Sequence, residues 1–542
     1  MIRGCGYHSI VKTKPAPALR RLTSRVRRAV TAVSAAALTS LLAATPAGHA
    51  QATSGAPSLP TLGDTAREDL SPVFERKLGE EIMRDIRRDR DFLDDDAVLE
   101  YMNNFGNALV AAYPGARGET NADYYFFAVR DPVLNAFALP GGFIGAHSGL
   151  LIAAQSESEL ASVMSHEIGH VAQRHIARML GQQRQDALIP LAAMLLAALA
   201  SQASGDAAMG VFMGGQGLAI QRQLDFSRDA EREADRVGFQ IMGAGGYDTT
   251  GMVEFFQRLQ SASRNYSDLT PAYLRSHPLT SERISDIQSR IRETPYRQRV
   301  DSIEFHLVRA RVRVLQDESV QGLRDTQAAF ESQLNQLSRQ QKAGAQYGLS
   351  FLELKRGNHV KAQEWLDKAR ATMKPPDNKA VLSAERADST GAAMFASLGI
   401  EIKLAPSQSA AVKLQGMKDA ELAHLQFPLS RGIARQYADA MIANGKLDDA
   451  AKFLRDQVQS YRSEPKLHDL LAKTYAAQGK LALQHMALAE SYALGGSVLA
   501  ALDQLNIARK AKDASFYDLA LIDAREREWQ AKRREEIEEA KK

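Results

Sequence analysis

Cysteine is almost absent from this chain of 542 residues, which contains only Cys5. Cys5 lies ahead of an apolar run near the N-terminus, so removal of that segment would leave a mature chain without cysteine. Such a chain has neither disulfide bonds nor a thiol nucleophile, and Cys5 is not placed as a lipoprotein acceptor. The fold must therefore be stabilised by its core alone.

Charge of one sign is also scarce. The net charge is only +4, and much of the excess lies in the first 28 residues. Nucleic-acid-binding proteins carry larger basic clusters, so we expect no nucleic-acid partner. A composition of 45% hydrophobic and 24% charged residues is typical of a globular protein, and the length predicts two or three domains.

Long hydrophobic runs of the kind that cross a membrane are missing. Residues 29–44 form a sixteen-residue, Ala-rich run that follows several arginines and precedes the small residues of "AGHAQA". This order predicts an export signal at 1–52, and a short membrane anchor is the alternative. The sequence is compatible with either Sec or twin-arginine export. We expect a linker at 53–69 and a mature chain without a transmembrane helix, located in the periplasm, either free or peripheral at the outer membrane.

The region from 70 to 300 combines helical periodicity with a short strand pair. The pattern is helical over about 70–112, and the segments "DYYFFAVRD" and "NAFALPGGFIGAHSGLL" then read as short strands with a Gly-rich turn at Gly141 and Gly142. Ser156 and Glu159 predict a capped helix start. The uncharged stretch 187–200 is too short to span a membrane, which favours a core helix or an interfacial lid over a membrane hairpin.

From residue 301 onward the pattern is helical throughout. Gly445 and Gly479 occupy equivalent places in two similar segments and lie 34 residues apart, which is the tetratricopeptide period. A nonspecific helical bundle is the alternative. We expect a mainly α protein, in which a domain with a small β-sheet at 70–300 precedes an α-solenoid of tetratricopeptide-like repeats at 301–542.

The segment "VMSHEIGHVAQRH" at 163–175 contains the pattern His-Glu-x-x-His. On a helix His166 and His170 point the same way, and Glu167 lies about 100° from His166. Two imidazoles and a neighbouring carboxylate are what a zinc hydrolase needs. His175 is five residues beyond His170, roughly 140° around the helix, so it is expected to face elsewhere.

A third ligand is predicted on a second helix, at Glu231 of "EREAD", 61 residues after His170. Asp235 lies one turn beyond Glu231 and is expected to support the site by hydrogen bonding. Glu233 lies about 200° from Glu231 and is expected to face solvent. Two histidines and one glutamate leave a position for water, which predicts one catalytic Zn²⁺ per chain held by His166, His170 and Glu231.

The segments "NAFALPGG", "SHEIGHV", "EREAD" and "SHPLTSERI" together resemble the HtpX and CAAX-prenyl-protease family of zinc metallopeptidases, over about 70–295. With an exported N-terminus and helical repeats, the chain looks most similar to BepA-like (YfgC-like) periplasmic peptidases. The resemblance implies a zincin-like α+β domain and a proton-donor role for Asp235, whereas spacing alone favours a supporting role. The chain lacks the transmembrane helices of HtpX and the prenyl proteases, which argues against a lipidated membrane substrate.

These residues predict a periplasmic zinc-dependent metalloendopeptidase in which Glu167 is the general base. The resemblance implies that it degrades misfolded or stalled outer-membrane β-barrel proteins, assists their assembly as a chaperone, and works with the outer-membrane β-barrel assembly machinery. The strand "NAFALPGGFIGA" offers an edge for an extended substrate. The alternative is a repeat-based adaptor or chaperone with a vestigial or structural metal site, and the complete motif argues against it.

His277 precedes Pro278 in "SHPLTSERI" and allows three interpretations. It is an ordinary surface-loop residue, or it folds back as a fourth zinc ligand that displaces the catalytic water, or it stabilises the oxyanion after swinging aside. We favour the second interpretation, in which His277 is a gate on the site.

Overall fold

The computed structural model describes residues 71–182, 217–265, 272–297, 299–335, 338–374 and 392–539. The expected signal peptide, the linker, the apolar stretch at 187–200, most of the glycine-rich segment after it and most of the interruption at 372–391 lie outside these residues. Within the described part, none of the helices combines the length and the apolar character that a membrane crossing requires.

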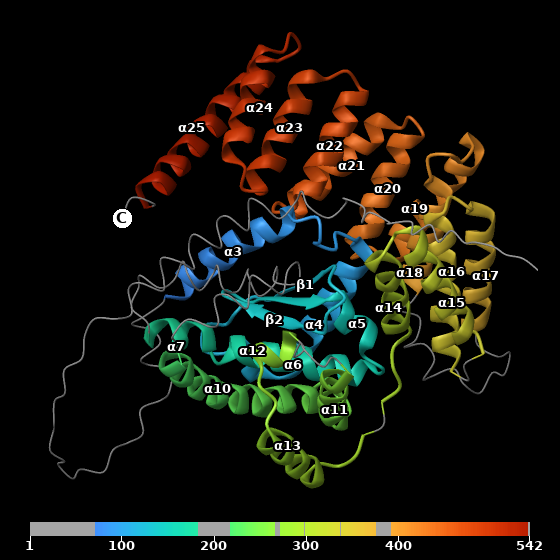
Figure 1. The fold of residues 1–542 in the computed structure, drawn as a ribbon. Helices are drawn as coiled ribbons and strands as arrows, with labels where there is room; N and C mark the ends of the chain where they lie inside the picture. Colours follow the sequence, from blue (N-terminus) through green and yellow to red (C-terminus); the bar gives the residue numbers. More distant parts are fainter. Residues whose placement is uncertain are drawn as a thin grey trace, which may run out of the picture. The chain divides into compact units, whose positions relative to one another are not determined.

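The N-terminal half contains a small sheet among helices, as the sequence predicts (Figure 1). Its elements are α3 (Pro72–Arg88), α4 (Asp96–Ala112), the 3-10 helix η1 (Pro114–Arg117), β1 (Tyr125–Val129), β2 (Ala136–Leu139), β3 (Phe143–His147), α5 (Ser148–Ala153), α6 (Glu157–Ala172), α7 (His175–Gln182), α10 (Gly217–Ala244), α11 (Thr250–Asn265), α12 (Ala272–Ser276) and α13 (Ser281–Glu293).

The sheet has three strands in the order β1-β3-β2. β2 and β3 form the expected hairpin, whose turn requires glycine because Gly141 and Gly142 have φ angles of 77° and 88°. Arg76 of α3 donates from Nη1 to the carbonyl of Gly141 at 2.9 Å and so ties the turn to that helix. Among the described strands β2 pairs only with β3, so it forms an edge of the sheet.

A single hydrophobic core runs from the sheet into the following helices. Phe126 of β1 and Ile144 of β3 are fully buried and belong to one cluster with Leu150 of α5. The same cluster includes Phe305 and Leu307, which lie beyond residue 300 on the first helix of the C-terminal half. Residues 71–176 and 226–542 accordingly form one compact unit.

The C-terminal half is a succession of helix pairs (Figure 1). They are α14 (Ile303–Gln316), α15 (Val320–Gln333), α16 (Arg339–Lys355), α17 (His359–Met373), α18 (Ala392–Leu404), α19 (Ala410–Gln426), α20 (Arg431–Ala443), α21 (Leu447–Ser460), α22 (Pro465–Ala477), α23 (Leu481–Leu494), α24 (Val498–Lys510) and α25 (Phe516–Glu539). The first residues of α20 and α22 are 34 positions apart, as are those of α21 and α23. Gly445 and Gly479 close the two hairpins with φ angles of 72°.

Helix α20 begins against α4. The carboxylate of Glu100 accepts hydrogen bonds from the backbone amide of Gly432 at 2.6 Å and from the hydroxyl of Ser430 at 2.9 Å. Nearby, Arg435 forms an ion pair with Asp96 at 2.7 Å. A carboxylate at a helix N-terminus satisfies free amides and interacts favourably with the helix dipole. Glu100 therefore fixes the start of α20 on α4.

Replacing Glu100 with alanine should weaken this attachment. The Gly432 amide and the Ser430 hydroxyl would lose a charged acceptor, which costs about 1.5–3 kcal/mol. We expect that loss in the free energy of unfolding and faster amide hydrogen exchange in the first turn of α20. Glu80→Ala is the control, because its exposed pair with Arg76 contributes roughly 0.3–0.5 kcal/mol. Equal losses in the two variants would contradict the assigned role of Glu100.

Candidate metal centre

Helix α6 presents the His-Glu-x-x-His pattern from a fixed start. Ser156 accepts a hydrogen bond from the backbone amide of Glu159 at 3.1 Å, which confirms the expected cap. The carboxylate of Glu159 accepts from the Gln155 amide at 2.9 Å and pairs with Arg258 at 2.6 Å. Nearly every side chain of α6 is buried. The direction in which His166 and His170 point is therefore set by the packing of the whole helix.

Helix α10 crosses α6 at two glycines. A Cβ atom on Gly238 would lie 3.0 Å from the backbone nitrogen of His166, and one on Gly169 would lie 2.9 Å from the carbonyl oxygen of Ala234. Such contacts leave no space for a side chain, so only glycine allows the two backbones to approach this closely. This close approach lets the short side chain of Glu231 reach the histidines of α6.

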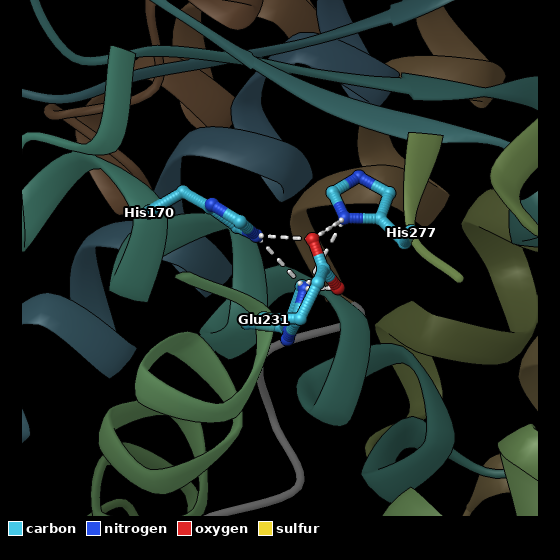
Figure 2. Close-up of side chains that lie close together, drawn as sticks. His170, Glu231 and His277 are labelled. Atoms are coloured by element: carbon cyan, nitrogen blue, oxygen red, sulfur yellow. Dashed lines mark hydrogen bonds and ion pairs between the residues drawn. The ribbon is translucent and has the colours of Figure 1, made fainter. Parts of the chain in front are cut away.

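Four side chains from three segments meet at one point. His166 and His170 come from α6, Glu231 from α10, and His277 from the residue directly after α12. One ligand atom of each lies within 4.8 Å of all the others. Figure 2 shows the rings of His170 and His277 directed at the Glu231 carboxylate. The structure thus brings together the three expected ligands and the expected gate residue.

The spacing of these atoms suits a tetrahedral zinc ion. The Nε2 atoms of His166 and His170 are 3.0 Å apart, and Glu231 oxygens lie 3.3 and 3.4 Å from them. His277 Nδ1 lies 3.4 Å from His166 Nε2 and 2.8 Å from Glu231 Oε1. Tetrahedral ligands at roughly 2.0–2.1 Å from zinc are separated by about 3.3 Å. The donor set of nitrogen and carboxylate oxygen is also one that zinc prefers.

The charge states favour binding of a cation. Burial opposes ionisation of Glu231, but the neighbouring His277 and His166 hold its pKa well below the usual range. Burial lowers the pKa of His170 to about 3, so its ring is neutral and can bind a metal. For His166 the effect of burial is outweighed by Glu231 and Asp235, which raise its pKa to about 10. Metal binding must therefore release a proton from His166.

Asp235 and Arg283 support the cluster from behind. His166 Nδ1 lies 2.9 Å from Asp235 Oδ1. Arg283 of α13 donates from Nε and Nη2 to both Asp235 oxygens, at 2.6 and 2.7 Å, and its Nη1 lies 2.8 Å from Glu231. Burial opposes ionisation of Asp235, yet Arg283 and His166 keep its pKa lowered. The geometry therefore supports the role that spacing alone assigned to Asp235, that of holding a ligand in place.

Glu167 stands beside the cluster, and neither of its carboxylate oxygens has a hydrogen-bond partner among the described residues. Its side chain is 1% exposed, and His277 Nε2 lies 3.5 Å from Oε1. Burial raises the pKa of Glu167, partly offset by His277 and His166. His277 itself is held by Tyr273, whose ring stacks on it with 4.5 Å between centroids. Glu167 and His277 thus lie next to each other at the edge of the cluster.

Two expectations for polar neighbours are wrong. His175 does not face elsewhere, because α6 ends at Ala172 and the chain turns back through Arg174, whose φ angle is 52°. His175 Nδ1 lies 2.9 Å from His170 Nδ1. Glu233 does not face solvent, because its carboxylate meets His175 Nε2 at 3.1 Å and its side chain is 18% exposed. The chain reversal at Arg174 brings His175 back between His170 and Glu233, which an uninterrupted helix would not do.

Known proteins place this centre in a family. The model of peptidase family M48 matches residues 108–291. The β-barrel assembly-enhancing protease of Yersinia pestis is 30% identical over 470 residues, which cover 86% of this chain and 90% of that protein. The chain belongs to peptidase family M48.

Two further relatives have the following coverage. The β-barrel assembly-enhancing protease of Escherichia coli K12 is 29% identical over 482 residues, which cover 87% of this chain and 91% of that protein. A Vibrio cholerae relative is 39% identical over 257 residues, which cover 47% of this chain and 51% of that protein. M48 members are zinc metallopeptidases, and a cluster that fits zinc is present, so the chain is a zinc metallopeptidase.

The M48 centre also contains residues to which the sequence pattern assigned no role. Arg283 lies six positions after His277 in "SHPLTSERI", and Tyr273 lies four positions before it. Neither is a metal ligand, so a search for ligand types passes over them. The available signal was the quoted segment itself, in which an arginine follows the histidine on the start of the next helix.

Substitutions of single residues test the assignment of the zinc ligands. His166→Ala, His170→Ala and Glu231→Ala should each weaken zinc binding by more than the roughly 10- to 100-fold typical of an outer hydrogen-bond partner. Zinc content after dialysis and competition with a chelator measure this. The control is His147→Ala, which removes a buried histidine that contacts Asn135 and not the cluster. Retention of zinc by His170→Ala at the level of the control would refute the ligand set.

Proposed function

We propose that this chain is a periplasmic zinc metalloendopeptidase that cleaves misfolded or stalled outer-membrane β-barrel proteins and assists their assembly. The observation that carries the proposal is the buried meeting of His166, His170 and Glu231 beside a Glu167 carboxylate. The names of the Yersinia and Escherichia relatives, aligned over most of both chains, support the substrate class and a link with the β-barrel assembly machinery.

In this proposal zinc, held by His166, His170 and Glu231, would acidify water and polarise the scissile carbonyl when bound. Glu167 accepts a proton from the attacking water on a carboxylate oxygen and then transfers it to the leaving amine. A raised pKa suits this exchange, because a general base works best when its pKa lies near the working pH. Asp235 keeps the His166 ring in place through Nδ1.

The sheet offers a way to bind substrate by its backbone. β2 packs against α6 and is an edge among the described strands, so an extended peptide could add to it by main-chain hydrogen bonds. Such binding depends little on sequence, but it requires a substrate strand whose own edges are free. An unfolded β-barrel protein has such strands, whereas in a closed barrel every strand is paired.

His277 is proposed to close this site. Its Nδ1 atom takes the fourth corner of the cluster, and Glu231, His166 and His277 are all buried, with no more than 7% of each residue exposed. A peptide carbonyl and water need that corner, so the segment with His277 must move before cleavage. This position of His277 supports the latch over the oxyanion-binding role, because the latter would leave the corner open. Substrate binding would then open the site only when a suitable chain is present.

The two halves of the chain are proposed to have different roles. We propose that residues 70–300 perform the cleavage and that the tetratricopeptide-like repeats of 301–542 bind a partner of outer-membrane assembly. Helices α14 and α20 contact the peptidase region through the shared core and through Glu100. An export signal at 1–52, the periplasm as location and a position beside the outer membrane belong to the same proposal.

The base and the substrate class can be tested together. The zinc-loaded protein should cleave a denatured outer-membrane β-barrel protein and spare the same protein folded in detergent. Glu167→Gln keeps the shape of the side chain but cannot accept the proton, so cleavage should fall by about 10²- to 10⁴-fold while zinc stays bound. Substantial turnover by zinc-loaded Glu167→Gln would contradict the assignment of Glu167 as the general base. Equal cleavage of the folded and the denatured β-barrel protein would contradict the proposed selectivity for unfolded substrates.

The latch has a separate test. His277→Ala should retain zinc, cleave a denatured substrate faster and cleave itself during storage, because the fourth corner is open. Stopped-flow cleavage of a labelled peptide and the rate of self-cleavage measure both effects, and His277→Ala/Glu167→Gln is the control for contaminating protease. A loss of about 10²-fold or more in turnover would instead assign His277 to the oxyanion.

A further inference from the structure

A chain of hydrogen bonds leads from the metal cluster to a carboxylate outside it. It begins at His170, whose Nε2 atom faces the other ligand atoms. On the far side of the ring, Nδ1 lies 2.9 Å from Nδ1 of His175. The second nitrogen of His175 lies 3.1 Å from Glu233 Oε2. His175 is 4% exposed and Glu233 is largely covered, so water competes little for these bonds.

If both imidazole rings are neutral, one arrangement of protons satisfies every bond in this chain. The Glu233 carboxylate can only accept, so His175 Nε2 must carry a proton. A neutral imidazole has one donor and one acceptor, so Nδ1 of His175 is the acceptor and Nδ1 of His170 must donate to it. The lone pair of His170 is then on Nε2, the atom that faces the metal position. A ring flip or the other tautomer would place two donors or two acceptors together.

Helix α10 controls both histidines of α6 through this arrangement. Glu231, Glu233 and Asp235 alternate along five residues of α10. Glu231 supplies a ligand atom, and Asp235 contacts the outer nitrogen of His166 directly. Glu233 reaches the outer nitrogen of His170 through His175, because α7 begins between them.

The turn that places His175 is itself anchored. Arg174 adopts a φ angle of 52°, a conformation that few residues other than glycine adopt. Its guanidinium donates from Nε and Nη2 to Glu75 of α3, at 3.1 and 2.9 Å. Both side chains are buried or nearly so. The chain reversal after α6 is therefore a fixed feature and holds the His175 ring against His170.

We propose that His175 and Glu233 are positioning residues that fix His170 as the tautomer with its proton on Nδ1 and its Nε2 atom free for zinc. This inference rests on the zinc centre proposed above. Outer partners of this kind orient a ligand ring and raise its basicity, and their loss typically weakens metal affinity by about 10- to 100-fold. Neither residue touches the reacting atoms, so their effect acts through His170.

The test uses full-length protein that carries Glu167→Gln, so that self-cleavage does not interfere. Zinc affinity is measured by chelator competition for His175→Phe, Glu233→Ala and Glu233→Gln. We expect His175→Phe and Glu233→Ala to weaken zinc binding by about 10- to 100-fold, and Glu233→Gln to recover part of the loss because its amide oxygen still accepts from His175. His147→Phe, in which another buried histidine is replaced, should bind zinc like the parent.

Nitrogen-15 NMR of histidine-labelled protein provides a second readout that loss of packing would not reproduce. In zinc-free parent protein, His170 should show a protonated Nδ1 and an unprotonated Nε2, whereas His175→Phe should show a mixture of tautomers. If His175→Phe leaves the His170 tautomer and the zinc affinity unchanged while His170→Ala loses zinc, the positioning role of His175 and Glu233 is wrong, and the zinc centre still stands. Retention of zinc by His170→Ala would overturn both the proposed zinc centre and the positioning role of His175 and Glu233.

Discussion

The site is built around a problem of buried charge. Glu167, Glu231 and Asp235 have side chains that are almost completely inaccessible to water, and they converge on the same small volume. Burying one unpaired carboxylate is costly, and neighbouring carboxylates repel each other. Arg283 is the permanent cation that faces two of the three, and the remaining compensation falls to histidines and to the metal that they suit. The register of α6, α10 and α13 must therefore be maintained together.

Glycine and tertiary packing supply that register. Gly238 faces the backbone of His166 and Gly169 faces the backbone of Ala234, so α6 and α10 lie too close together for a side chain at either glycine. Any larger residue would separate the Glu231 carboxylate from the two imidazoles, and the ligand atoms would no longer lie near 3.3 Å from one another. The metal site thus depends on residues that carry no functional group.

The sequence predicts the parts of this site that depend on local periodicity. His166, Glu167 and His170 are positioned by one helix, and the capped start of that helix is visible in Ser156 and Glu159. His175 is different, because its place depends on a left-handed residue, Arg174, and a helical angle cannot be extrapolated through such a turn.

Glu233 and the C-terminal half also have contacts that sequence periodicity does not predict. Helical spacing separates Glu233 from Glu231 on α10, but only the folded chain reveals that His175 lies opposite Glu233. Likewise the 34-residue spacing predicts the helix pairs, yet nothing periodic indicates that Phe305 and Leu307 of α14 share one core with the sheet. Because α4 packs both on α6 and on α20, the repeats are continuous with the scaffold of the metal ligands. The repeats and the metal-binding helices are therefore joined by packed side chains, which independent domains on a flexible tether would not be.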